Sequence, residues 1–191
     1  MADKLNKQLR NLLPWQQVAF CVGLAERMYP NYVLFSEGTE FGGEATFRKM
    51  LDLFWENLTV KGAKVNFETQ SEKFEEAIPN VADYDMYGVY PALDACVALS
   101  CAFNAVLTKA DDEAVNASQT SIGTVSSFIE ATSEAELTEQ EIWQDELIQQ
   151  ELAFQEELLT LLDEQRSPDL LKAVRKFCRN EGISNIGISL E

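Results

Sequence analysis

The sequence predicts an all-α protein, and three observations support this prediction. Apolar residues recur at helical spacing along almost the whole chain, prolines and capping residues mark helix ends, and no fixed repeat or low-complexity tract occurs. The chain has 191 residues, of which 46% are hydrophobic and 25% charged, which is the composition of an ordinary globular protein. Its length suits one domain. We therefore expect a single compact all-helical domain over residues 1–191.

The N-terminal half is expected to hold four helices. Pro14 suits the first turn of a helix running to about Met28, and residues 18–25 are apolar on every side, so this helix should be central and buried. Asn66 caps a later, shorter helix, and Pro91 opens the fourth. Between the Pro14 helix and the Asn66 helix lies another helix, with a core-facing stripe at i, i+3, i+4 and i+7 spacing. The stripe consists of Phe47, Met50, Leu51, Phe54, Trp55 and Leu58.

The C-terminal half is expected to hold three more helices. The first starts at Asp111 or Asp112 and runs to about Thr132. Two sequences of the capping-box form then predict that a long helix starts near residues 134–139. They are Ser133-x-x-Glu136 and Thr138-x-x-Glu141.

The last predicted helix follows the cap Ser167 and the first-turn proline Pro168, and Gly182 closes it. The connection before it is short, so we expect the last two helices to form an antiparallel hairpin. The chain then ends in "ISNIGISLE", in which apolar residues alternate. We expect this segment to be a short extended tail lying on an apolar surface.

The net charge of −17 is concentrated in one region of the sequence. Between residues 110 and 165 there are 15 Asp or Glu and no Lys or Arg, whereas the rest of the chain has 17 acids and 15 bases. Nucleic-acid binding is therefore not expected, because phosphate contacts need clustered cations, and an anionic membrane surface would repel the chain. We interpret residues 134–164 as a solvated face rather than a metal site, partly balanced by four cations of the last helix. These are Lys172, Arg175, Lys176 and Arg179.

Histidine is absent from the sequence, which excludes within this chain the sites that require imidazole. The four cysteines lie in apolar helical contexts and form no CxxC pair, so we expect reduced core thiols. The longest uninterrupted apolar run has eight residues, against roughly 20 for a membrane span. We therefore expect a cytoplasmic protein with no membrane segment.

Residues 83–94 contain part of a calcium-binding pattern. Asp83, Asp85, Gly88 and Asp94 occupy EF-hand positions one, three, six and twelve. A proline enters the loop, however, and the short Asp94 stands where a bidentate Glu normally binds the ion. A proline helix start at residue 91 would place Asp94 in a first turn, where a carboxylate is stabilised without metal. We expect neither a metal nor a cofactor.

Two carboxylates, Glu26 and Asp94, lie on otherwise apolar helix faces. Glu26 needs a partner if it is buried, and Arg48 is our candidate, with a structural ion pair preferred over a catalytic acid. Asp94 shares its face only with small residues, so either another helix packs closely there or a pocket remains. The walls of such a pocket would be tyrosines, namely Tyr84, Tyr87 and Tyr90.

Several blocks of the sequence resemble the YjaG family of bacterial cytoplasmic proteins, classed as a domain of unknown function. They are "LAERMYPNY", "LDLFWENLTVKGAKVNF", "EKFEEAIPN", "YDMYGVYPALDACVALS" and "SNIGI". The resemblance covers residues 14–100 closely and reaches the C-terminus, while residues 103–165 match only in helical character. It implies a compact helical protein and brings no catalytic residues. The tyrosine-rich blocks "ERMYPNY" and "YGVYPALDA" are where it places a shared surface.

Two hypotheses for function remain open at this point. The first is a non-enzymatic protein that acts by protein association, as a homo-oligomer, with a basic protein as a further partner. The second is a small-ligand-binding protein or a carboxylate-based enzyme. Its pocket would consist of Glu26, Tyr84, Tyr87, Tyr90 and Asp94.

Overall fold

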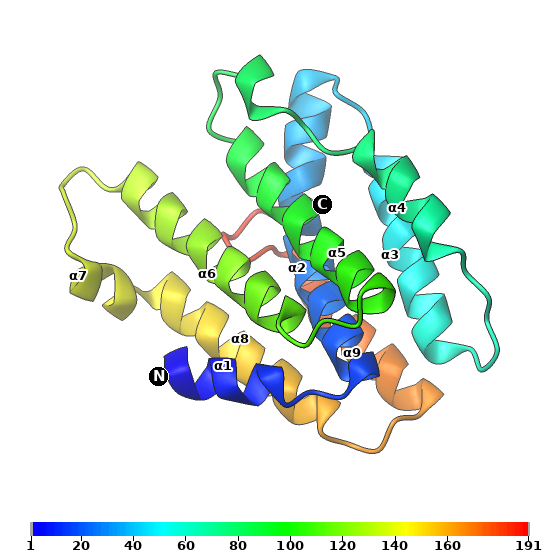
Figure 1. The fold of residues 1–191 in the computed structure, drawn as a ribbon. Helices are drawn as coiled ribbons and strands as arrows, with labels where there is room; N and C mark the ends of the chain where they lie inside the picture. Colours follow the sequence, from blue (N-terminus) through cyan, green and yellow to red (C-terminus); the bar gives the residue numbers. More distant parts are fainter. Residues whose placement is uncertain (1, 191) are drawn as a thin grey trace.

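The computed structural model describes residues 2–190 and is helical throughout, with one isolated β-bridge near the C-terminus (Figure 1). The fold is all-α, as the sequence predicted. The helices within this range are α1 Ala2–Arg10, α2 Pro14–Thr39, α3 Glu44–Thr59, α4 Phe67–Glu75, η1 Val81–Asp83, α5 Val89–Leu107, α6 Glu113–Thr132, α7 Glu139–Gln144, α8 Glu146–Leu162, α9 Pro168–Arg179 and η2 Asn180–Gly182.

The centre of the molecule is the pair α2 and α5. In Figure 1, α5 lies in front of α2, and the two pack against one another along their lengths. The predicted central segment, residues 18–25, is buried on every side. Small side chains allow this close approach. On α5 they are Ala98, Cys101, Ala102 and Ala105, which are all buried. This agrees with a closely packed helix on this face, one of the two alternatives that the sequence left open.

An aromatic cluster joins α3 and α4 to this centre. All six residues of the predicted α3 stripe are buried. Phe54 stacks on Phe67 of α4 with ring centroids 4.6 Å apart, and Phe103 of α5 meets Phe54 edge to face at 4.8 Å. Burial of this much aromatic surface fixes both helices on α5. Asn66 caps α4 as predicted, accepting a hydrogen bond from the Thr69 amide.

Helix α2 is longer than the sequence predicted, because it continues through Pro30 to Thr39. A proline inside a helix removes one backbone hydrogen bond. Tertiary contacts of the following turns offset this loss, since Tyr32 is fully buried and its hydroxyl donates to the Ala77 carbonyl at 2.7 Å, while Phe35 packs edge to face on Tyr84. The predicted end near Met28 was therefore wrong.

The long helix predicted after residue 134 is two helices, α7 and α8. Asp145 separates them with an extended backbone, and its side chain accepts a hydrogen bond from the Leu147 amide to cap α8. Of the two predicted capping boxes, that of Thr138 and Glu141 is present. Ser133 instead follows the end of α6 as its C-terminal cap residue.

Helix α9 starts at Pro168 with Ser167 as its cap, as predicted, but it ends at Arg179 rather than at Gly182. It packs on α2 and α3 as well as on α8, and the antiparallel hairpin stays a prediction. The tail is not simply extended. It turns back on itself in a bridge between Ile183 and Ser189, because the Ser184 amide donates to the Ile188 carbonyl at 2.8 Å.

One helix in the described part of the chain, α5, is long and apolar enough to cross a membrane by length and composition. Most of it is buried among the other helices, and the core helix of a folded domain meets the same criterion. This is weak evidence for a membrane span.

Candidate functional site

Glu26 is the centre of an ion-pair cluster between α2, α3 and α9. Its side chain is 1% exposed, and Arg48 of α3 binds both carboxylate oxygens, with Nη1 2.8 Å from Oε1 and Nη2 2.6 Å from Oε2. Trp55 Nε1 donates to Oε2 at 2.9 Å, and Arg179 Nε of α9 donates to Oε1 at 3.2 Å. The sequence predicted the Glu26–Arg48 pair. It did not predict Arg179, which is 153 residues away.

The charges in this cluster set the protonation of Glu26. Burial by itself would raise the pKa of Glu26, but the hydrogen bonds and charge of Arg48, with Trp55 and Arg179, lower it overall. Glu26 is therefore held as a carboxylate anion. A general acid would need the opposite shift, so this arrangement favours a structural ion pair.

The cluster extends towards the surface through Asp52. This residue lies one turn after Arg48 on α3, with its Oδ1 3.4 Å from Arg48 Nε, and it also pairs with Nη2 of Arg175 on α9. Two carboxylates thus hold three guanidinium groups. We call this set the Glu26 cluster; its members are Glu26, Arg48, Asp52, Trp55, Arg175 and Arg179.

A second polar cluster lies deeper, around Glu151 of α8. Glu151 is fully buried, and its carboxylate pairs with Arg27 Nε at 2.9 Å and accepts hydrogen bonds from Ser121 Oγ at 2.7 Å and Gln155 Nε2 at 2.9 Å. Asn185 of the tail donates to Ser121 Oγ at 3.0 Å. The tail is thereby tied to α2, α6 and α8. Sequence reasoning missed this cluster, because Glu151 lay in a segment interpreted as a solvated acidic face.

Asp94 has a different set of neighbours from Glu26. It lies on α5, six residues into the helix rather than in its first turn, and accepts a hydrogen bond from Thr124 Oγ1 of α6 at 2.7 Å. Burial raises the pKa of Asp94, and the Thr124 hydrogen bond only partly offsets this. The partners of Glu26 lie on α3 and α9. Each of the two carboxylates is therefore satisfied by a separate set of residues.

The three predicted tyrosines are also divided. Tyr84 packs edge to face on Phe35 and Phe41. Tyr87 and Tyr90 have ring centroids 6.2 Å apart, and burial together with the charge of Asp94 raises the pKa of Tyr87. The structure thus gathers Tyr87, Tyr90 and Asp94, while Glu26 and Tyr84 make contacts elsewhere.

Tyr90 begins a narrow strip of α5 whose residues are exposed or half-buried. We call it the α5 strip, and its members recur at alternating spacings of three and four residues: Tyr90, Leu93, Val97, Ser100, Asn104 and Leu107. Tyr90 is 54% exposed, Val97 37% and Leu107 46%. In Figure 1, α5 lies at the front of the molecule with no other helix crossing over it. The strip carries no charged residue.

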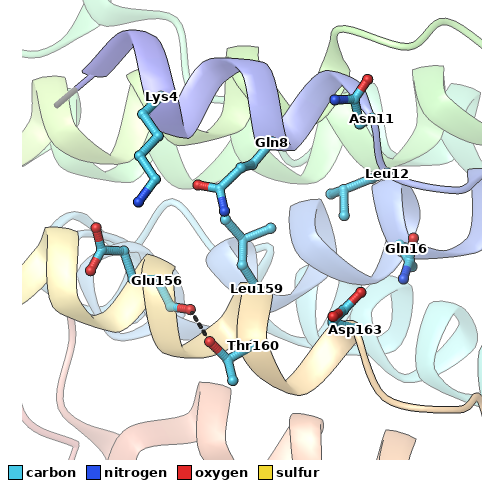
Figure 2. Close-up of a pocket in the computed structure, with 9 residues that line it drawn as sticks. All are labelled: Lys4, Gln8, Asn11, Leu12, Gln16, Glu156, Leu159, Thr160 and Asp163. Carbon is cyan, nitrogen blue, oxygen red and sulfur yellow. Dashed lines mark hydrogen bonds between the residues drawn. The ribbon is translucent and has the colours of Figure 1, made fainter.

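Four pockets on the described surface have linings that include neither Glu26 nor Asp94 nor any of the three tyrosines. One pocket of about 500 Å³ lies between α1 and α8, where Lys4 and Gln8 point towards Glu156 and Leu159 (Figure 2). A second, of about 420 Å³, lies beside α9. Among residues 2–190 no three His, Cys, Asp or Glu side chains converge in a way that could hold a metal ion.

Comparison with known proteins gives a family whose fold agrees with the helical fold described above. The sequence model of the family described as "Protein of unknown function (DUF416)" matches residues 4–189. This chain belongs to the DUF416 family. It is 45% identical over 194 residues to the uncharacterized protein YjaG of Salmonella typhimurium, covering 100% of this chain and 99% of that protein.

Other members of the family extend the comparison. The uncharacterized protein YjaG of Escherichia coli K12 is 45% identical, covering 98% of this chain and 97% of that protein, and one from Haemophilus influenzae is 42% identical, covering 98% of each. The crystal structure of a DUF416 family protein from Shewanella baltica has a TM-score of 0.88 and 37% identity, covering 96% of this chain and 97% of that one. The expected resemblance is confirmed, and it includes the 103–165 region within one continuous match.

Proposed function

We propose that the protein acts by protein association, as a homodimer formed through the α5 strip. The carrying observation is the spacing of the strip, in which four exposed and two half-buried residues are separated by three, four, three, four and three positions. This is the spacing of the seam along which two helices pair. The strip is apolar or uncharged from end to end. Tyr87, packed between Tyr90 and Phe128, widens the apolar area on the α6 side.

A second copy of this chain is the partner that the charges favour. Each copy has a net charge of −17, so two copies repel one another across most of their surfaces. Contact is least opposed where charges are absent, and a two-fold axis through the α5 strip would bring two uncharged surfaces together. Asn104, the one amide on the strip, would fix the register by pairing with a polar partner.

Light scattering with size-exclusion chromatography tests this proposal. We expect a particle of twice the 21.5 kDa chain mass, and we expect Val97→Glu to shift it to the monomer. Losing the burial of two valines costs about 3 kcal/mol, which corresponds to roughly a 100-fold weaker dimer. The matched control is Val60→Glu, because Val60 is 51% exposed in the loop after α3. A wild-type monomer at micromolar concentration, or equal effects of both variants, would refute the dimer.

The proposal also includes a cellular compartment and a further partner. We place the protein in the cytoplasm, which is supported by four buried cysteines that are free thiols, the state a reducing compartment maintains. A basic protein remains a further partner, supported by the acidic α6 to α8 surface. Three of the α9 cations form ion pairs, with Asp169, Asp52 and Glu26, which lie outside residues 134–164. The predicted balance of charge between α9 and residues 134–164 stays a prediction.

The second candidate function is small-ligand binding by the group of Asp94, Tyr87 and Tyr90. The observation that favours it is the half-buried carboxyl of Asp94, whose pKa is raised by burial and whose charge in turn raises the pKa of the neighbouring Tyr87. Thermal-shift screening of metabolites and divalent ions tests this candidate, since a ligand bound by the native state alone raises the melting temperature. Asp94→Asn should abolish any such shift. If no compound raises the melting temperature, or if the shift survives in Asp94→Asn, this candidate fails.

A further inference from the structure

The exposed face of α9 gathers cations on a protein that is otherwise strongly acidic. Four residues at helical spacing, Lys172, Arg175, Lys176 and Arg179, line the cavity of about 420 Å³, together with Glu181 and Gly182. Four of the six lining residues are therefore cationic, and one is acidic. The whole chain carries −17, so the charge of this cavity is opposite in sign to that of the protein.

Two of these cations are held in place by carboxylates behind them. Arg179 Nε donates to Glu26, and Arg175 Nη2 pairs with Asp52, so both guanidinium groups are fixed by the Glu26 cluster. Fixing a side chain in advance reduces the conformational entropy that it loses on binding a ligand. The two arginines are thus preorganised, whereas Lys172 and Lys176 lie at the exposed rim.

The fixed arginines still have unused hydrogen-bond donors. A guanidinium has five N–H groups. Within the described residues, Arg179 donates only through Nε, and Arg175 only through Nη2, while the buried Nε of Arg175 has no acceptor. The Nη groups of Arg179 belong to a side chain that is 52% exposed. The Nη groups of Arg179 are therefore available to a ligand that carries several oxygen acceptors.

We propose that this cavity binds a small molecule through a phosphate or polycarboxylate group. Arginine forks match the paired oxygens of such anions, and two lysines add point charges at the rim. The site is distinct from the α5 strip and does not depend on dimer formation. A lipid headgroup within an anionic membrane is a poorer match, since the net charge repels such a surface.

Isothermal titration calorimetry with pyrophosphate, and separately with citrate, tests the proposal at constant ionic strength. We expect saturable binding of at least one anion to the wild type, and about tenfold weaker binding to Lys172→Gln/Lys176→Gln. Neither lysine belongs to the Glu26 cluster, so the double variant should fold normally, which thermal unfolding checks. The matched control is Lys61→Gln/Lys73→Gln, which removes two exposed lysines elsewhere and should bind as the wild type does.

Three results would overturn the proposal. The first is no binding of either anion at millimolar concentration. The second is equal weakening in the control variant, which would show a diffuse attraction rather than a site. The third is sedimentation with phosphatidic acid vesicles in the absence of binding to free anions, which would assign the cations to a membrane surface.

Discussion

Replacing Arg48 by methionine tests the energetics of the Glu26 cluster directly. Arg48 supplies two of the four hydrogen bonds to Glu26, and its removal leaves a carboxylate that is 1% exposed with only Trp55 and Arg179 as donors. Removing one partner of a buried pair typically costs 3 to 5 kcal/mol. Since Arg179 remains and Arg48 is 28% exposed, we expect about 3 kcal/mol of lost unfolding free energy at pH 7.

The pH dependence of this loss provides a second, independent check. The pKa of Glu26 is lowered in the folded protein, so its contribution to stability is present above the ordinary value of 4.5 and is lost as pH falls through the folded pKa. In Arg48→Met the largest contribution to that lowering is removed, while those of Trp55 and Arg179 remain. The difference in stability between wild type and variant should therefore shrink below pH 4.5.

Urea unfolding followed by circular dichroism measures both effects. Lys49→Met is the matched control, because Lys49 is exposed on the same helix and should change stability by less than about 0.5 kcal/mol. Glu26→Gln/Arg48→Met completes a double-mutant cycle, and we expect the double variant to be less destabilised than the sum of the single ones. A loss below about 1 kcal/mol in Arg48→Met, or one that does not change with pH, would refute this account.

Three further predictions follow from packing and burial. Gly23→Ala should destabilise the protein by about 1 to 2 kcal/mol in urea unfolding, because its Cβ would lie 2.8 Å from Cys178 Sγ; Cys178→Ala should restore part of the loss, and unchanged stability of the single variant would contradict this. Asp94→Asn should stabilise the protein at pH 7 in urea unfolding, because burial raises the pKa of Asp94 and so disfavours its charged form. The wild type should therefore gain stability as pH falls through that pKa towards 3.8, whereas the variant should lack this gain; a destabilised variant at pH 7 would count against the account. The four buried thiols, whose pKa values are all raised chiefly by burial, should react with Ellman's reagent at pH 8 only after denaturant is added, and rapid reaction of any native thiol would show an opening that the structure lacks.

The parts of the fold that the sequence determined are those set by local interactions. The α3 stripe follows from helical periodicity, and the caps at Asn66, Thr138 and Ser167 each bind an amide three residues ahead. Such contacts are complete within one or two turns. They can be predicted from composition and spacing because no distant residue takes part.

The candidate site was predictable only in part. Because Glu26 lies on an apolar helix face, it needs a partner when buried, and Arg48 was the candidate named from the sequence. Arg179 binds Glu26 from 153 residues away and the tail residue Asn185 binds Ser121 from 64 residues away, and no periodicity predicts such contacts. Helix α2 passes through Pro30 for a similar reason, since the local cost of a proline is smaller than the burial gained by the turns beyond it.

The sequence by itself therefore determined the all-helical class, several helix caps, the free core thiols and the charge of this protein. Tertiary structure decided which charges meet, so that Glu26 faces α3 and α9 while Asp94 faces α6. It also decided that the strip along α5 is exposed or half-buried. The physical reason is that helix formation depends on residues three and four apart, whereas pairing of buried polar groups depends on how the packed helices lie in space.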